Sequence, residues 1–88
     1  MTLEDTWKKQ LELLLQTYIR HSGKTETYLS VVAAGDASFF ARLRGGRSTT
    51  IRRLSVVVQW FSDNWLEGVS WPDESFMRPY PVQSGTMR

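Results

Sequence analysis

The sequence predicts an all-α fold, a small four-helix bundle followed by an extended aromatic C-terminal tail. Three observations predict it. Apolar residues recur at three- and four-residue steps up to Trp65, which is the period of helices that bury one face. Glycines and capping residues interrupt this pattern, so that four helical segments result. All three prolines lie after Trp71, where the helical pattern has ended.

The first two helices are predicted from their apolar stripes and their stop signals. The first covers residues 3–21, and Gly23 is a typical residue to end it. Its stripe consists of Leu3, Trp7, Leu11, Leu14, Leu15, Tyr18 and Ile19. A short second helix begins after Thr25, which is a favourable N-cap, and ends at Gly35.

The third and fourth helices follow from the same reasoning. Asp36 can cap the third, in which Phe40 and Leu43 face inward, and the glycine pair 45–46 ends it. Thr49 or Thr50 then caps the fourth helix. Its inward residues are Ile51, Leu54, Val57, Val58, Phe61 and Trp65. The run SVVVQWF would also suit a strand because it is β-branched, but the spacing and the length favour a helix.

Residues 1–68 are therefore predicted to form one helical domain, and residues 69–88 a tail rich in proline and aromatic residues. The tail has no helical stripe, yet it contains Trp71, Phe76 and Tyr80. Free tails are usually poor in aromatic residues. We therefore expect part of the tail to dock on the bundle or on a neighbouring molecule.

The residue types that catalysis or metal binding requires do not occur together. The 88 residues include no cysteine and a single histidine, His21, which lies at a helix end. The segment RLRGGR contains a glycine pair but lacks the Gly-Lys-Ser/Thr of a phosphate-binding loop. We expect no enzyme activity, metal, cofactor or small-molecule ligand. No apolar run reaches the roughly 20 residues of a membrane span, and no signal peptide begins the chain, so we expect a cytoplasmic protein.

The charge is distributed unevenly along the chain. The net charge is only +2, but residues 36–60 contain five arginines and one acid, Asp36, and so carry +4. Residues 1–35 sum to zero, and residues 61–88 sum to −2. A middle third that holds the whole excess indicates a surface facing a polyanion, although a solvated basic face without a partner is the alternative.

Residues 25–46, TETYLSVVAAGDASFFARLRGG, resemble the helix-turn-helix of the Cro-type (XRE, lambda-repressor-like) DNA-binding family. The family pattern has an apolar residue where Leu29 stands and a small residue at Ser30. A turn follows at residues 34–35, and inward apolar residues stand at Phe40 and Leu43. A basic loop and a further helix come next, as they do in the family.

The chain departs from the family pattern at three positions. Glu26 stands where members often carry glutamine close to a phosphate, and Gly35 comes one residue later than the usual turn glycine. Phe39 falls where many members have a small polar residue near the DNA. For Phe39, packing in the core is the alternative to a contact with a base.

The resemblance implies a helix-turn-helix bundle that binds double-stranded DNA with its third helix in the major groove. The residues expected to read bases are Ala37, Ser38, Phe39 and Arg42. The residues expected at the DNA backbone or in the minor groove are Thr25, Arg44, Arg47, Thr49, Thr50, Arg52 and Arg53.

Domains of this type usually act as symmetric dimers on paired half-sites. The apolar residues expected to form a homodimer interface are Trp60, Trp65, Trp71, Phe76 and Tyr80. The resemblance thus implies a bacterial or phage-derived transcription regulator, associated with the nucleoid and acting as a repressor. The alternative is a protein-interaction adaptor or antitoxin whose aromatic tail binds a partner.

Overall fold

The computed structural model describes residues 3–81; the first two residues and the last seven of the predicted tail lie outside this range. Residues 3–81 contain four helices and no strand. They are α1 (Leu3–Ser22), α2 (Glu26–Ala34), α3 (Phe39–Arg44) and α4 (Ile51–Asp63). The predicted all-α class is confirmed. No helix in the described range is long and apolar enough to cross a membrane.

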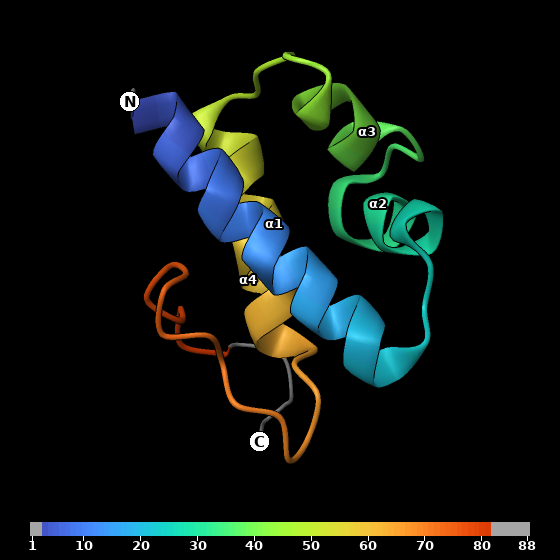
Figure 1. Ribbon diagram of the computed structural model, residues 1–88, viewed down its shortest axis with the longest axis vertical. Helices are drawn as coiled ribbons and strands as arrows, with labels where there is room; N and C mark the ends of the chain where they lie inside the picture. The colour runs from blue at the N-terminus through green and yellow to red at the C-terminus, as the bar shows by residue number, and fades with distance from the viewer. Residues whose placement is uncertain (1–2, 82–88) are drawn as a thin grey trace.

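The helices form two layers around one core (Figure 1). Helix α1 lies along the long axis in front of α4, and α2 and α3 lie together on one side of this pair. Tyr18 connects α1 to α4. Its ring contacts the rings of Trp60 and Phe61, and its hydroxyl donates to the Asn64 carbonyl at 2.9 Å. Burial, and to a smaller extent the nearby Tyr28, raises the pKa of the Tyr18 phenol, so this hydroxyl stays a neutral donor.

Most of the predicted helix ends are confirmed by their hydrogen bonds. The Thr25 hydroxyl accepts from the Tyr28 amide at 3.0 Å, and Thr50 accepts from the Arg53 amide at 3.1 Å, so both are N-caps. Gly35 has a φ of 73°, a left-handed conformation that glycine adopts readily, and it turns the chain from α2 into α3.

The start of α3 differs from the prediction. The Asp36 carboxylate accepts from the amide of Ser38, two residues on, and the Asp36 carbonyl accepts from the Phe39 amide. These bonds hold residues 36–38 in a turn, so α3 begins only at Phe39. Ala37 and Ser38, which were expected on the third helix, therefore precede it.

The core takes residues from all four helices. The buried hydrophobic residues are Leu11, Leu14, Leu15, Tyr18, Leu29, Ala33, Phe39, Phe40, Leu43, Val57, Val58 and Phe61. The predicted inward position of Ile51 is wrong: its side chain is 80% exposed, on a side of the first turn of α4 that faces away from the core. Trp65 packs against the core as expected, but from beyond the end of α4.

The described part of the tail folds back onto the bundle (Figure 1). The Ser75 hydroxyl donates to the Gln10 carbonyl of α1 at 2.8 Å. Arg78 donates to the hydroxyl and the carbonyl of Ser62 in α4, at 3.1 and 2.6 Å, and its guanidinium lies 5.6 Å from the Trp71 ring. The tail thus contacts the two long helices of its own chain.

Four of the five aromatic residues expected at a dimer interface pack within their own chain instead. Trp60, Trp65, Trp71 and Phe76 are partly buried and pack against the core of the same chain. The Trp65 and Trp71 rings lie 4.9 Å apart, and the Trp71 indole donates to the Phe76 carbonyl. Tyr80 alone of the five remains open, with 87% of its surface exposed. The tail therefore packs on the bundle of its own chain. This is one of the two positions expected for it, the other being a neighbouring molecule.

Candidate nucleic-acid interface

The solvent-facing side of α3 follows from which of its residues the core buries. Phe39, Phe40 and Leu43 point inward, so Ala41 and Arg42 remain exposed, as do Ala37 and Ser38 in the preceding turn. The Ser30 hydroxyl, itself fully buried, accepts from the Phe40 amide at 3.4 Å and joins α3 to α2. Three of the four residues predicted to read bases, Ala37, Ser38 and Arg42, therefore share one exposed face.

The prediction that Phe39 contacts a base is wrong. Its side chain is only 4% exposed and packs edge-on against Phe40, with 5.1 Å between ring centroids. The physical reason is the position of Phe39 at the start of a six-residue helix that packs on α2, where adjacent residues can both reach the core. Core packing, the alternative for this residue, is the observed arrangement.

A polar concavity of about 280 Å³ lies beside this face, where the end of α2, α3 and the start of α4 meet. Three arginines from three segments line it: Arg42 from α3, Arg47 from the loop and Arg53 from α4. Ser48 and Thr49 add two hydroxyls, and Asp36 is the one acidic residue of its lining. A concave surface with three guanidinium groups and two hydroxyls offers many hydrogen-bond donors to an oxyanion.

The arginines of this region differ in their partners. Arg42 forms an ion pair with Asp36, and Arg53 donates to the Ala34 carbonyl at the end of α2, at 2.8 Å. Neither the Arg47 nor the Arg52 side chain has a hydrogen bond or ion pair with any residue of the range 3–81. Arg52 and Arg53 also lie in the first turn of α4, where cations oppose the helix dipole unless an anion is bound.

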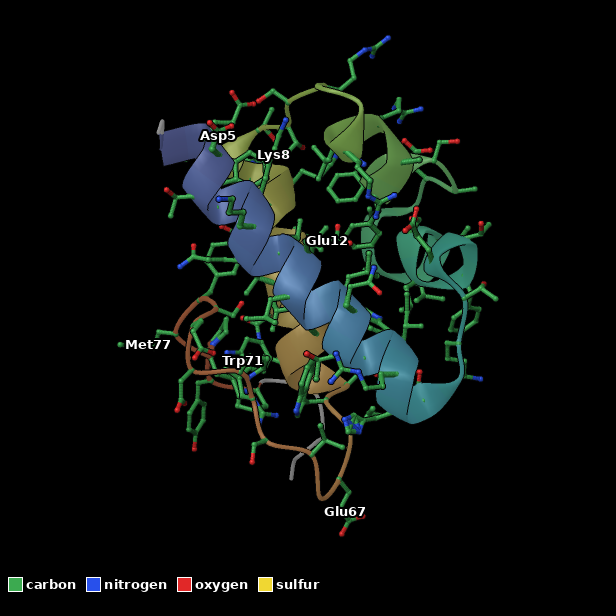
Figure 2. All side chains as sticks on the ribbon, viewed as in Figure 1. Asp5, Lys8, Glu12, Glu67, Trp71 and Met77 are labelled. Atoms are coloured by element: carbon green, nitrogen blue, oxygen red, sulfur yellow. The ribbon has the colours of Figure 1, made fainter. Side chains whose placement is uncertain are left out.

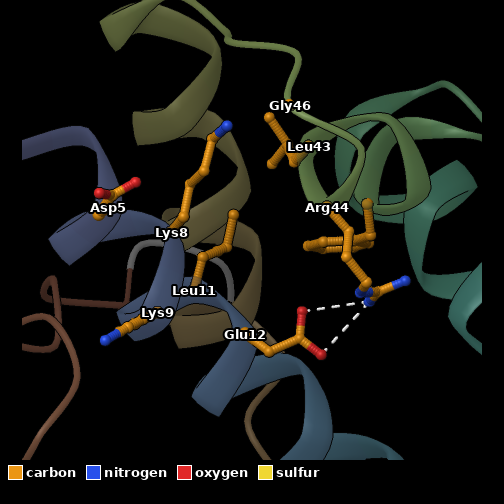
Figure 3. Close-up of a pocket in the computed structure, with 9 residues that line it drawn as sticks. Asp5, Lys8, Lys9, Leu11, Glu12, Leu43, Arg44 and Gly46 are labelled. Atoms are coloured by element: carbon orange, nitrogen blue, oxygen red, sulfur yellow. Dashed lines mark hydrogen bonds and ion pairs between the residues drawn. The ribbon is translucent and has the colours of Figure 1, made fainter.

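Arg44 is held at the protein surface by two carboxylates, of which Figure 3 shows that of Glu12. It donates to Glu26 at 2.7 and 3.2 Å and to Glu12 at 3.1 and 3.3 Å, so that α3 is joined to both α2 and α1. These bonds, those from Glu26 first, raise the pKa of the Arg44 guanidinium. In this conformation the Arg44 guanidinium binds two acids of its own chain, so the predicted contact with a DNA backbone would have to compete with Glu12 and Glu26. The same contacts neutralise Glu26, the acid that departs from the family pattern.

The predicted backbone-binding threonines fall into two groups. The hydroxyls of Thr25 and Thr50 accept the capping bonds of α2 and α4. Thr49 lines the concavity and is brought next to Arg47 and Arg53. Thr25 lies at the opposite end of α2 from Gly35, so it is not part of the concavity.

A larger hollow of about 730 Å³ lies between the first half of α1 and the end of α3 (Figure 3). Leu11, Phe40 and Leu43 form its apolar part. Its charged residues have both signs and are Asp5, Lys8, Lys9, Glu12 and Arg44. Because it combines acids with bases, this hollow suits a polyanion less well than the concavity does. Among residues 3–81, no group of three or more possible metal ligands occurs.

The sequence reasoning missed three residues of the interface. Ala41 is exposed between Ser38 and Arg42, and its position three residues after Ser38 could have shown this. Ser48 lines the concavity from the loop, where no periodicity applies. Asp36 was predicted only to cap the third helix. Its carboxylate also forms an ion pair with Arg42, which lies one turn into α3.

We predict that Arg47→Ala weakens binding to specific and random duplexes by similar factors. Arg47 has no side-chain partner among the described residues, so if this surface binds DNA, as the sequence predicts, the variant loses a phosphate contact and not a structural one. The slope of log affinity against log salt should fall by about one unit. Arg20→Ala is the matched control, since Arg20 lies in the last turn of α1, at the far end of the molecule from the loop (Figure 1). An unchanged slope for Arg47→Ala would place the DNA surface elsewhere.

Comparisons with known proteins reveal no relative: no protein-family model matches the chain, and neither do curated proteins or solved structures.

Proposed function

We propose that this protein is a sequence-specific double-stranded DNA-binding protein that regulates transcription as a cytoplasmic, nucleoid-associated repressor without enzyme activity. The observation that carries the proposal is the concavity formed by Arg42, Arg47 and Arg53 beside the exposed side of α3. Phosphate groups of a duplex are the anions that such a surface meets at regular spacing. The likeness of residues 25–46 to the lambda-repressor-like helix-turn-helix supports the same reading.

In this proposal the two parts of the surface have different tasks. The exposed side of α3 enters the major groove, where Ala37 and Ala41 contact thymine methyl groups and Ser38 bonds a base edge. The Arg42 guanidinium donates to O6 and N7 of a guanine. Arg47, Thr49 and the start of α4 then lie along the sugar–phosphate backbone, which sets the register of the protein on the duplex.

A homodimer on paired half-sites remains part of the proposal, because one short helix reads too few base pairs to select a site alone. The interface would have to use surface of the helices that the folded tail leaves exposed. The alternative of an adaptor or antitoxin with a free aromatic tail has less support, since Trp71 and Phe76 already pack on their own chain.

The proposal is tested by selecting duplexes from a random library and measuring the affinity of the best site at several salt concentrations. We expect one enriched sequence, tighter binding of it than of random duplex, and affinity that falls steeply with salt. A protein that enriches no sequence and binds with little salt dependence would contradict the proposal and favour an adaptor.

Arg42→Ala should cost about 1–3 kcal/mol on the selected site and relax the preference at one base pair. The reason is that a bidentate contact to guanine is lost while the backbone contacts remain. Repeating the selection with the variant measures this directly. If Arg42→Ala weakens all sequences alike, Arg42 contacts a phosphate and the proposed register of α3 is incorrect.

A further inference from the structure

Asp36 is an acid in the basic concavity, and its negative charge would weaken a surface that only bound phosphates. We infer that Asp36 is a positioning residue that increases sequence discrimination, by orienting Arg42 toward the bases and by repelling phosphates from the same guanidinium. This inference rests on the proposed DNA binding and assigns a specificity-determining residue to it.

Both oxygens of the Asp36 carboxylate are in use. One oxygen accepts from the Ser38 amide at 3.0 Å, and the other forms the ion pair with Arg42. Ser38 and Arg42 are two of the four exposed residues proposed to read bases. Asp36 thus contacts both of them at once.

The backbone around Asp36 is also held. Its amide donates to the Ser30 carbonyl of α2 at 3.3 Å, and its carbonyl accepts from the Phe39 amide at 3.0 Å. Arg42 in turn donates its amide to the Ser38 carbonyl at 2.9 Å. The carboxylate is therefore fixed relative to the start of α3, and it can limit the positions that the long Arg42 side chain adopts.

The electrostatics favour bases over phosphates at this point. A phosphate that approaches Arg42 carries a full negative charge and meets the Asp36 carboxylate, whereas a guanine edge presents neutral acceptors. A guanidinium has five N–H donors, so the contact with Asp36 leaves donors for O6 and N7 of the base. The Asp36 charge consequently weakens non-specific binding more than specific binding. It thereby increases the ratio of the two affinities.

The test is Asp36→Asn, which keeps an acceptor for the Ser38 amide and removes the charge. We expect the affinity for random duplex to rise about three- to tenfold and the salt slope to steepen by about one unit, because Arg42 is now free to bind a phosphate. The affinity for the selected site should rise less, so the ratio of specific to random affinity falls. Glu67→Gln is the matched control: it removes the same charge from an exposed residue at the far end of the molecule (Figure 2).

A double-mutant cycle decides whether Asp36 acts through Arg42. In an Arg42→Ala background, Asp36→Asn should leave the ratio of specific to random affinity unchanged. If Asp36→Asn lowers the thermal midpoint, Asp36→Ser replaces it, because serine also accepts from an amide two residues on.

The outcomes separate the two proposals. A wild-type protein that shows no sequence-selective, salt-dependent binding overturns the proposed function. A wild-type protein that discriminates, together with an Asp36→Asn variant of equal ratio or one that changes no more than Glu67→Gln does, overturns only the role of Asp36.

Discussion

Phe39→Ala is expected to lower the free energy of unfolding by about 3–5 kcal/mol, which is the usual cost of removing a buried aromatic ring. The ring is 4% exposed, packs against Phe40 and belongs to the same cluster as Phe61, so its removal leaves a cavity that the short α3 cannot fill. A domain of this size is stable by only about 5–15 kcal/mol in total. The substitution should therefore remove a large part of the stability, and urea unfolding followed by circular dichroism measures it.

Tyr80→Ala is the control for this measurement, because the Tyr80 side chain is 87% exposed and its carbonyl, which accepts from Gln59, is kept. Its effect should lie within about 0.5 kcal/mol. A Phe39→Ala variant that keeps its stability but loses affinity for one class of DNA site would contradict the buried position and restore a contact with a base.

Truncation after Glu67 is expected to have the second large effect. It removes Trp71 and Phe76, each of which is partly buried, and the bonds from Ser75 and Arg78 to the two long helices. The lost burial amounts to about 2–4 kcal/mol, which corresponds to a fall in thermal midpoint on the order of 10–30 °C. The truncated chain should remain helical at low temperature, because none of the four helices extends beyond Asp63.

Sedimentation of the same truncated protein tests the assembly of the molecule. Since the tail packs on its own chain, we expect truncation to leave the oligomeric state unchanged. Trp71→Ala in the full chain is the companion variant, and it should reproduce part of the loss in midpoint. A truncated protein that is as stable as the full chain, but changes from dimer to monomer, would show that the tail joins two copies.

The helices could be predicted from the sequence because their signals are local. Thr25 and Thr50 cap helices through bonds to residues three positions on, and Gly35 ends α2 with its own backbone conformation. Periodicity was less reliable at the ends of elements. It placed Ile51 inward, although what covers a first turn depends on other elements, and it extended α4 to Trp65, although the chain leaves the helix earlier.

The site was predictable only in part, for a related reason. The one-signed charge of residues 36–60 and the exposed side of α3 are visible in the sequence, and the concavity joins residues from that segment. The partners of the charges are not visible there. Arg44, which was assigned to DNA, binds Glu26 and Glu12, and these partners lie 18 and 32 residues away in the sequence. Phe39 and Phe40 likewise show that two adjacent residues can both be buried, which a helical period does not predict.

The docked tail also sets a condition on any other protein that would bind its aromatic residues. Trp71 and Phe76 already pack against the core of the same chain. Because the tail is covalently joined to the bundle, it docks at an effective concentration in the millimolar range. A competitor would have to displace it, and its apparent affinity would be reduced by the small fraction of molecules in which the tail is detached. A protein that binds the tail only weakly would therefore fail to displace it from the bundle. Only a protein that also stabilises the detached state could bind the tail.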